Sequence, residues 1–234
     1  MKFSEMKYER PDLAAVKDEL HALTERLKAA RDYAEAREAF LAHEAAYIHM
    51  ETQATLASVR HTIDTRDEFY DAEETFWNAA TPELDAYEDA WKGTMLESPF
   101  RKEFAAEYGD LMFINAEIAR KAFSPEIIPE CQQENDLSQA YSKLIASAQI
   151  PFEGGVYTIS QLSPFKNDPD DARRLAAWQA EGAWYKEHQA EFDEIYDKME
   201  VGETALCTYY AGDYLSMYDN NPDLKYVIPK EGSN

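Results

Sequence analysis

Residues 33–64 decide the fold, and they read YAEAREAFLAHEAAYIHMETQATLASVRHTID. This stretch contains no glycine or proline, and apolar residues such as Phe40, Leu56 and Val59 recur along it. An uninterrupted stretch of residues that tolerate the helical backbone favours one long helix over several short ones. We therefore predict a single helix over residues 33–64 and expect the rest of the fold to pack around it.

Helical patterns continue on both sides of this stretch. The apolar residues before it are Leu13, Val16, Leu20, Leu23 and Leu27. Their alternating spacing predicts an amphipathic helix over residues 11–30, with Pro11 in its first turn. Residues 67–80 continue the helical pattern, and three hydroxyl–proline pairs then predict helix starts, because the hydroxyl can cap the helix and proline fits its first turn. These pairs are Thr81-Pro82, Ser98-Pro99 and Ser124-Pro125. Residues 1–147 should form about six or seven helices with short joints.

The pattern changes after this helical region. Two short β-prone runs, residues 149–152 and 156–159, flank Glu153-Gly154-Gly155, which predicts a β-hairpin. Asn167-Asp168-Pro169 then predicts the start of a helix that runs to about residue 198. Its expected apolar stripe consists of Leu175, Trp178, Gly182, Tyr185 and Phe192. The four tryptophans lie at helical positions and are expected in the core: Trp77, Trp91, Trp178 and Trp184.

Residues 200–234 have a different composition. Three of the eight glycines lie there, and the order of patterns is strand (205–210), helix (212–220) and strand (226–229). The sequence thus predicts a mainly α fold: a multi-helix domain over residues 1–199 with one small β-hairpin, plus a short α/β tail over residues 200–234. We expect this tail not to complete the helical fold, because a strand–helix–strand piece needs neighbouring strands.

Charge limits the possible partners. The chain has 23 Lys and Arg against 46 Asp and Glu, a net charge of −23. This disfavours binding to nucleic acids or anionic membranes and favours cationic or neutral peptides, polyamines and basic proteins. Cys131 and Cys207 cannot form a disulfide framework, and the N-terminal residues lack the apolar segment of a secretory signal. We expect a cytoplasmic protein.

No catalytic or metal-binding residues are predicted from the motifs. A zinc peptidase needs His-Glu-x-x-His on a helix, so that two imidazoles one turn apart bind the metal. The nearest string is His43-Glu44-Ala45-Ala46-Tyr47, in which Tyr47 occupies the second ligand position, while His49 lies on another face. A di-iron site has one chance match, Asp18 three residues before His21, and no nucleophile motif is present.

Several strings, in order, resemble the N-terminal region of oligoendopeptidase F-like enzymes of peptidase family M3. They are Met1-Lys2-Phe3, Tyr8-Glu9-Arg10-Pro11, residues 55–65 (TLASVRHTIDT), Glu97-Ser98-Pro99-Phe100-Arg101-Lys102, Tyr108-Gly109-Asp110, residues 124–130 (SPEIIPE), residues 149–157 (QIPFEGGVY), Ser163-Pro164-Phe165 and residues 168–174 (DPDDARR). The resemblance covers residues 1–199. It implies a mostly helical, cytoplasmic hydrolase that cleaves short peptides with one Zn²⁺ held by His-Glu-x-x-His and a downstream Glu.

In that family the N-terminal region packs over the catalytic half and helps to wall the substrate channel. The zinc motif would begin after the point where this resemblance ends, so the resemblance assigns no zinc ligand or general base to this chain. The expected partners are accordingly the catalytic half or short peptides, and no peptidase activity is expected from this chain alone.

The tail resembles another family, the spermidine/putrescine-binding proteins of ABC transporters. The residues concerned are Tyr209-Tyr210-Ala211-Gly212-Asp213, Asn221-Pro222-Asp223-Leu224 and residues 227–234 (VIPKEGSN). By this resemblance Tyr210 would stack on a polyamine. The string at residues 193–199 (DEIYDKM) is compatible with both families, which favours a chimera joined near residues 193–200; a true fusion gene is the other explanation. The alternatives to the peptidase reading are a polyamine-binding transporter fragment and a freestanding acidic helical adaptor.

Overall fold

The structure is a computed structural model that describes residues 2–199. Residues 200–234, with the predicted α/β tail and Tyr210, lie outside the described residues. The elements are η1 (Phe3–Glu5), α1 (Leu13–Lys28), α2 (Tyr33–Ile63), α3 (Glu68–Glu97), α4 (Arg101–Tyr108), α5 (Leu111–Ala122), η2 (Pro125–Ile127), α6 (Ile128–Ala146), β1 (Ile150–Phe152), β2 (Gly155–Tyr157), α7 (Ile159–Lys166) and α8 (Asp171–Glu187). Residues 189–199 are also helical. The predicted mainly α fold with one small hairpin is confirmed for this part of the chain.

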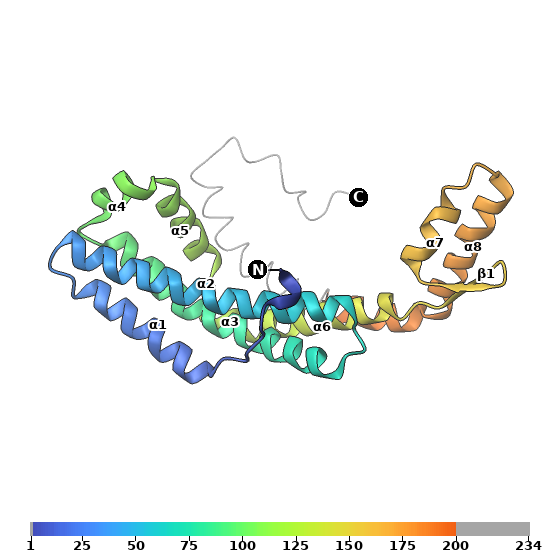
Figure 1. Ribbon diagram of the computed structural model, residues 1–234, viewed down its shortest axis with the longest axis horizontal. Coiled ribbons are helices and arrows are strands. Elements are labelled where there is room, and N and C mark those ends of the chain that lie inside the picture. The colour runs from blue at the N-terminus through green and yellow to red at the C-terminus, as the bar shows by residue number, and fades with distance from the viewer. Residues whose placement is uncertain (1, 200–234) are drawn as a thin grey trace, which may run out of the picture.

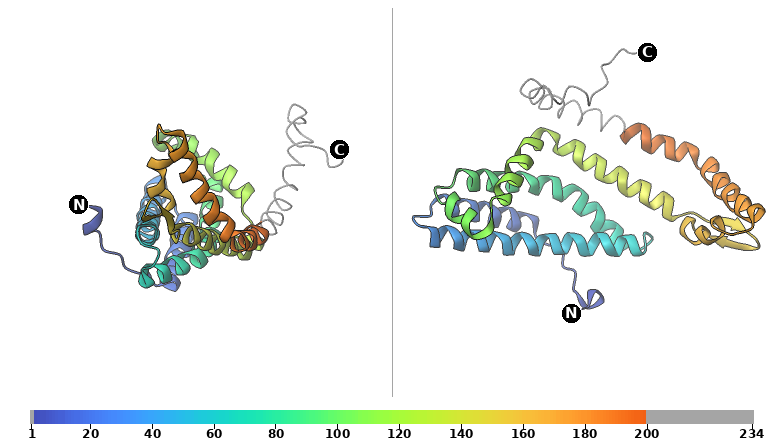
Figure 2. Two further views of the ribbon diagram at one scale, coloured as in Figure 1. Left: turned by 90° about the vertical axis from the view of Figure 1, so that its right-hand side faces the viewer. Right: turned by 90° about the horizontal axis from the view of Figure 1, so that it is seen from above.

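The helices form an elongated bundle with two raised ends (Figure 1). α1, α2 and α3 lie along one another, and α6 runs beside α3. α4 and α5 rise at one end of this bundle, while the β-hairpin, α7 and α8 rise at the other end on the same side. Seen from above, α6 leads from the bundle to the hairpin end (Figure 2). α8 and the helical residues 189–199 then run back from that end.

The long predicted helix is present as α2. Its start is fixed by Asp32, whose carboxylate accepts a hydrogen bond from the Glu35 amide. α1 begins at Leu13, two residues later than predicted, because Asp12 is its N-cap and accepts hydrogen bonds from the amides of Ala14 and Ala15. Pro11 therefore precedes the cap and does not lie in the first helical turn.

The prediction that Thr81-Pro82 starts a helix is wrong, because α3 continues through Pro82. Proline removes one backbone donor and leaves the carbonyl four residues earlier without its helical partner. That carbonyl belongs to Asn78, and it accepts a hydrogen bond of 3.1 Å from the Asn135 side chain of α6. The next carbonyl, of Ala79, accepts one of 2.6 Å from Gln132. The helix thus tolerates Pro82 because α6 supplies replacement donors.

The other two predicted starts differ in outcome. Ser98 is the C-terminal cap of α3, and α4 begins at Arg101 with Phe100 in the cap position, so that prediction is wrong by two residues. Ser124 does cap η2, because its hydroxyl accepts a hydrogen bond from the Glu126 amide. η2 then leads directly into α6, as the sequence predicts.

The hairpin is present and shorter than predicted. Ile150 pairs with Tyr157 and Phe152 with Gly155, so Gly155 belongs to β2 and not to the turn. The turn consists of Glu153 and Gly154, with φ values of 47° and 82°. Two successive positive φ angles match the right-handed twist of a two-residue hairpin. α7, which follows at once from a capping box at Thr158, was not predicted.

The stripe predicted on the next helix lies on the wrong face. α8 buries Ala177, Glu181 and Trp184, whereas Leu175 and Trp178 are 57% and 54% exposed. The buried face includes Glu181 because its carboxylate pairs with Lys166 of α7. α8 also ends at Glu187, short of residue 198, and the predicted core residue Phe192 is buried on the helical residues that follow.

Three apolar clusters stabilise the described residues. One joins α1–α5 around Phe40, Trp91 and Phe104, and a second joins α1, α2 and α3 around Trp77. The third lies at the hairpin end around Leu162 and Trp184. Three of the four tryptophans are therefore in the core as predicted. Within residues 2–199 no helix combines the length and apolarity needed to cross a membrane.

Candidate functional site

The first candidate surface is the outer face of α5. Leu111, Ile114 and Ile118 occur at spacings of three and four and are 66%, 50% and 60% exposed. The opposite face of the same helix is also apolar, because Phe113 and Ala116 pack into the core. Contiguous exposed apolar side chains are common at interaction surfaces, so this face is a candidate docking surface. We call these three residues the α5 face.

A second exposed apolar surface lies at the opposite end of the molecule. Leu175, Trp178 and Tyr185 lie on the solvent side of α8. Val156 of β2, at the same end of the molecule, is 62% exposed. The Lys166 ammonium lies 4.6 Å from the centre of the Trp178 ring, which covers one side of the indole with a cation. We call Leu175, Trp178 and Tyr185 the α8 face.

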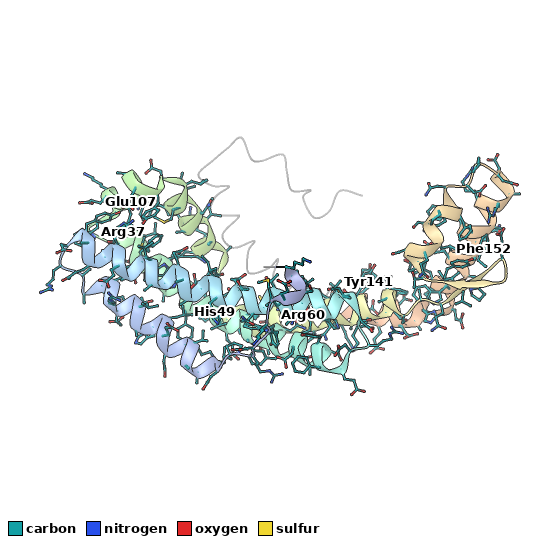
Figure 3. The ribbon with its side chains drawn as sticks, viewed as in Figure 1. Arg37, His49, Arg60, Glu107, Tyr141 and Phe152 are labelled. Carbon is teal, nitrogen blue, oxygen red and sulfur yellow. The ribbon has the colours of Figure 1, made fainter. Side chains whose placement is uncertain are left out.

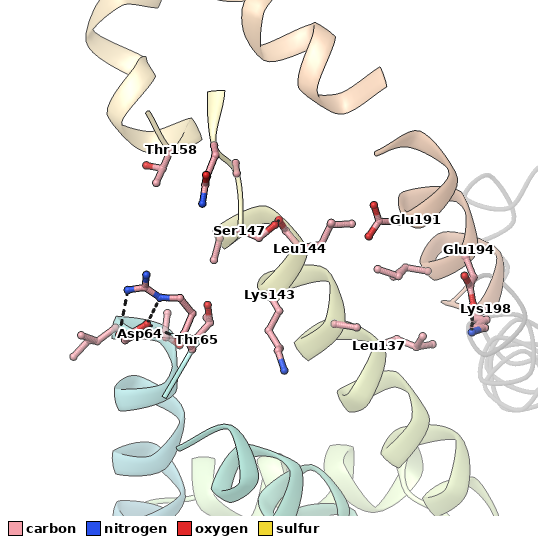
Figure 4. Close-up of a pocket in the computed structure, with 18 residues that line it drawn as sticks. Asp64, Thr65, Leu137, Lys143, Leu144, Ser147, Thr158, Glu191, Glu194 and Lys198 are labelled. Atoms are coloured by element: carbon pink, nitrogen blue, oxygen red, sulfur yellow. Dashed lines mark hydrogen bonds and ion pairs between the residues drawn. The ribbon is translucent and has the colours of Figure 1, made fainter. Parts of the chain in front are cut away.

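Between the two ends lies a groove of about 960 Å³ (Figure 4). It is lined by the turn between α2 and α3, the C-terminal half of α6 and the helical residues 189–199. Leu137, Leu144 and Ile195 provide apolar lining, and Lys143 and Glu191 contribute charges of both signs. A groove with apolar patches and charges of both signs can accommodate an extended peptide, whose backbone is polar and whose side chains are mixed.

Asp71 fixes the geometry behind this groove. Its carboxylate accepts hydrogen bonds from Lys143 at 2.8 and 2.9 Å and from Gln139 at 2.8 Å. His61 Nε2 of α2 lies 3.3 Å from the same carboxylate. The Lys143 ammonium holds the pKa of Asp71 below its ordinary value. Asp71 of α3 thereby holds α6 at the groove, and His61 of α2 lies beside the same carboxylate without a hydrogen bond to it.

The N-terminal segment is tied to the bundle by a second carboxylate. Glu73 is buried and accepts hydrogen bonds of 2.8 and 2.7 Å from Arg10, and it also bonds to the Tyr8 hydroxyl. Burial and the bond to Glu73 raise the pKa of Tyr8 to about 12. At the far end, Arg37 of α2 pairs with Glu107 of α4 at 2.7 Å (Figure 3). These contacts position elements and offer no reactive group.

The described residues do not fit a zinc site. His43 is buried, with its ring parallel to that of Trp91 at 3.8 Å, and Tyr47 follows it one turn later. His49 is exposed on α2 (Figure 3). Residues 2–199 contain no group of three His, Cys, Asp or Glu side chains placed to hold a metal ion. The suggested ligand residue Tyr210 lies outside the described part.

Comparisons with known proteins agree on one family. The peptidase M3 N-terminal domain matches residues 3–123. A solved chain described as oligoendopeptidase F is 37% identical, with a TM-score of 0.85, and the match covers 89% of this chain and 37% of that one. PZ peptidase A, solved with an inhibitor, is 36% identical with a TM-score of 0.84, covering 88% of this chain and 37% of the other. An oligoendopeptidase F from Bacillus anthracis is 32% identical with a TM-score of 0.86, covering 89% and 38%.

The chain therefore belongs to the peptidase M3 family, a family of metallopeptidases, and its residues 3–123 match the N-terminal domain of that family. It spans little more than a third of the length of these solved relatives. No match was found among curated proteins.

Sequence reasoning found only part of this site. The residues of the α8 face were identified as an apolar stripe, and Trp178 was assigned to the core. The sequence also predicts an exposed apolar patch for docking on a catalytic half, at the hairpin or on the helix that carries Trp178 and Trp184, and Trp178 and Val156 are indeed exposed there. The α5 face was missed, although Leu111-Met112-Phe113-Ile114 contains apolar residues on both sides of a helix, and Ile118 extends the outer side. A helix that is apolar all round is a sign of burial on two sides.

Proposed function

We propose that residues 1–199 form the non-catalytic N-terminal region of a zinc-dependent oligoendopeptidase that hydrolyses short peptides. In this proposal the α5 face and the α8 face dock on the catalytic part. The exposed α5 face carries the proposal, because a three-residue apolar stripe is left in water on a chain that matches little more than a third of its relatives. The raised ends of the bundle suit a lobe that contacts its partner at two points.

The groove between these ends would contribute to the wall of the peptide channel. Its mixed lining supports that role, and the net charge of −23 would favour cationic or neutral peptides. Zinc and the activated water would come from residues of the catalytic part, because no three-ligand cluster exists in residues 2–199. We assign this role to the cytoplasm, where the free thiol of Cys131 remains reduced.

The direct test is metal analysis and peptide hydrolysis on the purified chain. We expect no stoichiometric zinc and no cleavage of fluorogenic oligopeptides, with or without added Zn²⁺. About one tightly held zinc per chain, as a catalytic site would hold, together with chelator-sensitive cleavage, would overturn the proposal.

For residues 200–234 we propose a separate origin, joined to the peptidase region near residues 193–200. The change in composition and the resemblance to polyamine-binding proteins support this proposal. Reading the genomic DNA across codons 190–205 tests it: a junction between two genes is expected, and a continuous peptidase frame would contradict it. If Tyr210 does bind polyamines, spermidine should stabilise the chain against heat, and a Tyr210→Ala variant should lose that effect.

A further inference from the structure

A smaller pocket of about 420 Å³ lies between α2, α3 and α5, away from the groove. Its walls are apolar and rich in polarizable groups: Phe40, Trp91, Met95, Met112 and Phe113. Two carboxylates, Glu44 and Glu88, also line it, as does the ammonium-bearing Lys92. An apolar pocket with a few converging polar groups is the usual form of a small-ligand site.

The Glu88 carboxylate lacks a satisfactory partner. Its side chain is 7% exposed, and its Oε1 atom has no hydrogen-bond partner. His43 Nε2 lies 3.0 Å from Oε1, but the ring is held parallel to Trp91, and neither ring nitrogen of His43 has hydrogen-bond geometry to any acceptor or donor. Among residues 2–199 no Lys or Arg forms an ion pair with Glu88. A buried carboxylate without a matched donor is costly, and a bound cation removes that cost.

Glu44 adds a second acceptor on the same side of the pocket. It lies one turn from Phe40 on α2 and carries no hydrogen bond from another described side chain. Burial raises the pKa of Glu44, the His43 ring at 4.0 Å lowers it, and the nearby Glu88 raises it, with a net upward shift. The effects of burial and of Glu88 are those of negative charge held in a poorly solvated place, and a positive ligand relieves both. Lys92 forms no ion pair with either carboxylate among the described residues, so the pocket keeps its negative character.

We propose that this pocket binds an alkylammonium group, with the ammonium between Glu88 and Glu44 and the aliphatic chain between Trp91, Phe113 and the two methionines. Aromatic faces and carboxylates together favour an organic cation over an inorganic one, because the rings attract the charge and also accept the apolar chain. Anions are repelled, and a neutral alcohol leaves Glu88 without a charged partner. The proposal goes beyond the docking role and does not depend on it.

The test is titration of the complete 234-residue chain with n-pentylammonium, followed by calorimetry and ligand-observed NMR. Salt at about 150 mM screens the general attraction of an acidic protein for cations. We expect one saturable site, with n-pentanol binding at least about tenfold more weakly, as loss of a charge-assisted hydrogen bond predicts. Equal binding of the alcohol and the amine would overturn the proposal.

Two pairs of variants locate the site. Glu88→Gln keeps the shape of the side chain and removes its charge, so affinity should fall about tenfold or more. The matched control Glu97→Gln removes an exposed charge at the end of the same helix and should leave affinity unchanged. Ala119→Phe should fill the pocket from α5 and abolish binding, whereas Ala122→Phe, on the same helix and outside the pocket, should not.

The pairs also distinguish a specific site from weak attraction to the surface. Equal losses in Glu88→Gln and Glu97→Gln, or unchanged binding in Ala119→Phe, would contradict the proposal. If Glu88→Gln fails to fold, the Ala119 and Ala122 pair decides alone. Competition by Nα-acetyl-lysine amide identifies a lysine side chain as the natural source of the group. Binding of pentylammonium without such competition identifies a free amine.

Discussion

The carboxylate of Asp71 connects α3 to α6 on the groove side of the molecule. It belongs to α3, accepts three hydrogen bonds from α6 and faces His61 of α2. Its side chain is 31% exposed, so the contacts with Lys143 are only partly screened by water. The position of α6, and with it one wall of the groove, therefore depends on the charge of this carboxylate.

Replacing Asp71 by Asn should lower the free energy of unfolding by about 1–2 kcal/mol at neutral pH, because the charge-assisted bonds to Lys143 become neutral ones. The pKa of folded Asp71 is lowered, so its stabilising effect is present above the unfolded pKa of about 4 and is lost as the pH falls through the folded value. Urea unfolding at several pH values measures this. The difference between the two proteins should shrink below about pH 4.

Asp64→Asn is the matched control for this prediction. Asp64 also pairs with an arginine, Arg66, but both side chains are about half exposed or more, at 49% and 88%. Solvent screening should make its effect clearly smaller than that of Asp71→Asn. Equal effects of the two substitutions would show that Asp71 does not hold α6 in place.

At the scale of elements, the contact between α3 and α6 depends on a proline. Pro82 leaves the Asn78 carbonyl without a backbone donor, and the Asn135 side chain of α6 donates a hydrogen bond to that carbonyl. α6 has no buried residue, so polar contacts are prominent in its attachment to α3: the amide side chains of Gln132 and Asn135 and the ammonium of Lys143. Sequence reasoning took Pro82 as a helix start because proline is most often found there, and only the partner helix reveals the other solution.

A double-mutant cycle tests this explanation. Asn135→Ala should cost about 1–2 kcal/mol in the natural background, because the Asn78 carbonyl loses its partner. In a Pro82→Ala background the new backbone N–H can bond to that carbonyl, and the same change should cost about 1 kcal/mol less. Gln133→Ala, at an exposed position of α6, is the control and should show no coupling. Additive effects of Asn135→Ala and Pro82→Ala would refute the account.

Two glycines at the hairpin end should respond to alanine in opposite directions. Gly154 has a φ of 82°, so Gly154→Ala should destabilise the protein by about 1 kcal/mol. Gly182 lies within α8 with open space around an added Cβ, so Gly182→Ala should stabilise it by about 0.5–1 kcal/mol. Thermal unfolding of the two variants measures both signs, and a shared sign would contradict the assigned backbone geometry.

Local patterns predicted the elements better than their faces. The helix at residues 33–64 and the Gly-containing hairpin follow from composition and turn chemistry, which act within a few residues. The buried face of α8 could not be predicted in this way, because it depends on Lys166 of α7, which draws Glu181 inward and leaves Trp178 outside. The same limit applies to the α5 face, whose exposure depends on where α2 and α3 lie.

At the scale of the whole molecule, the exposed faces of α5 and α8 should make the isolated chain associate weakly or bind apolar dyes. The triple variant Leu111→Ser, Ile114→Ser, Ile118→Ser should reduce dye fluorescence without loss of helical signal, because the core side of α5 is unchanged. The matched control Leu41→Ser, Ile48→Ser changes exposed residues of α2 and should reduce it less. If the natural chain binds no dye, the assignment of a docking face is contradicted.

The central claim is that residues 1–199 dock on a catalytic part through these faces. Co-expression of the tagged chain with the remaining C-terminal part of the related oligoendopeptidase F, followed by affinity capture and zinc analysis, tests it most directly. The account predicts a one-to-one complex that contains zinc and cleaves peptides, and that is lost with the triple serine variant of α5. A C-terminal part that is soluble and active yet never captured, or captured equally by the variant, would contradict it.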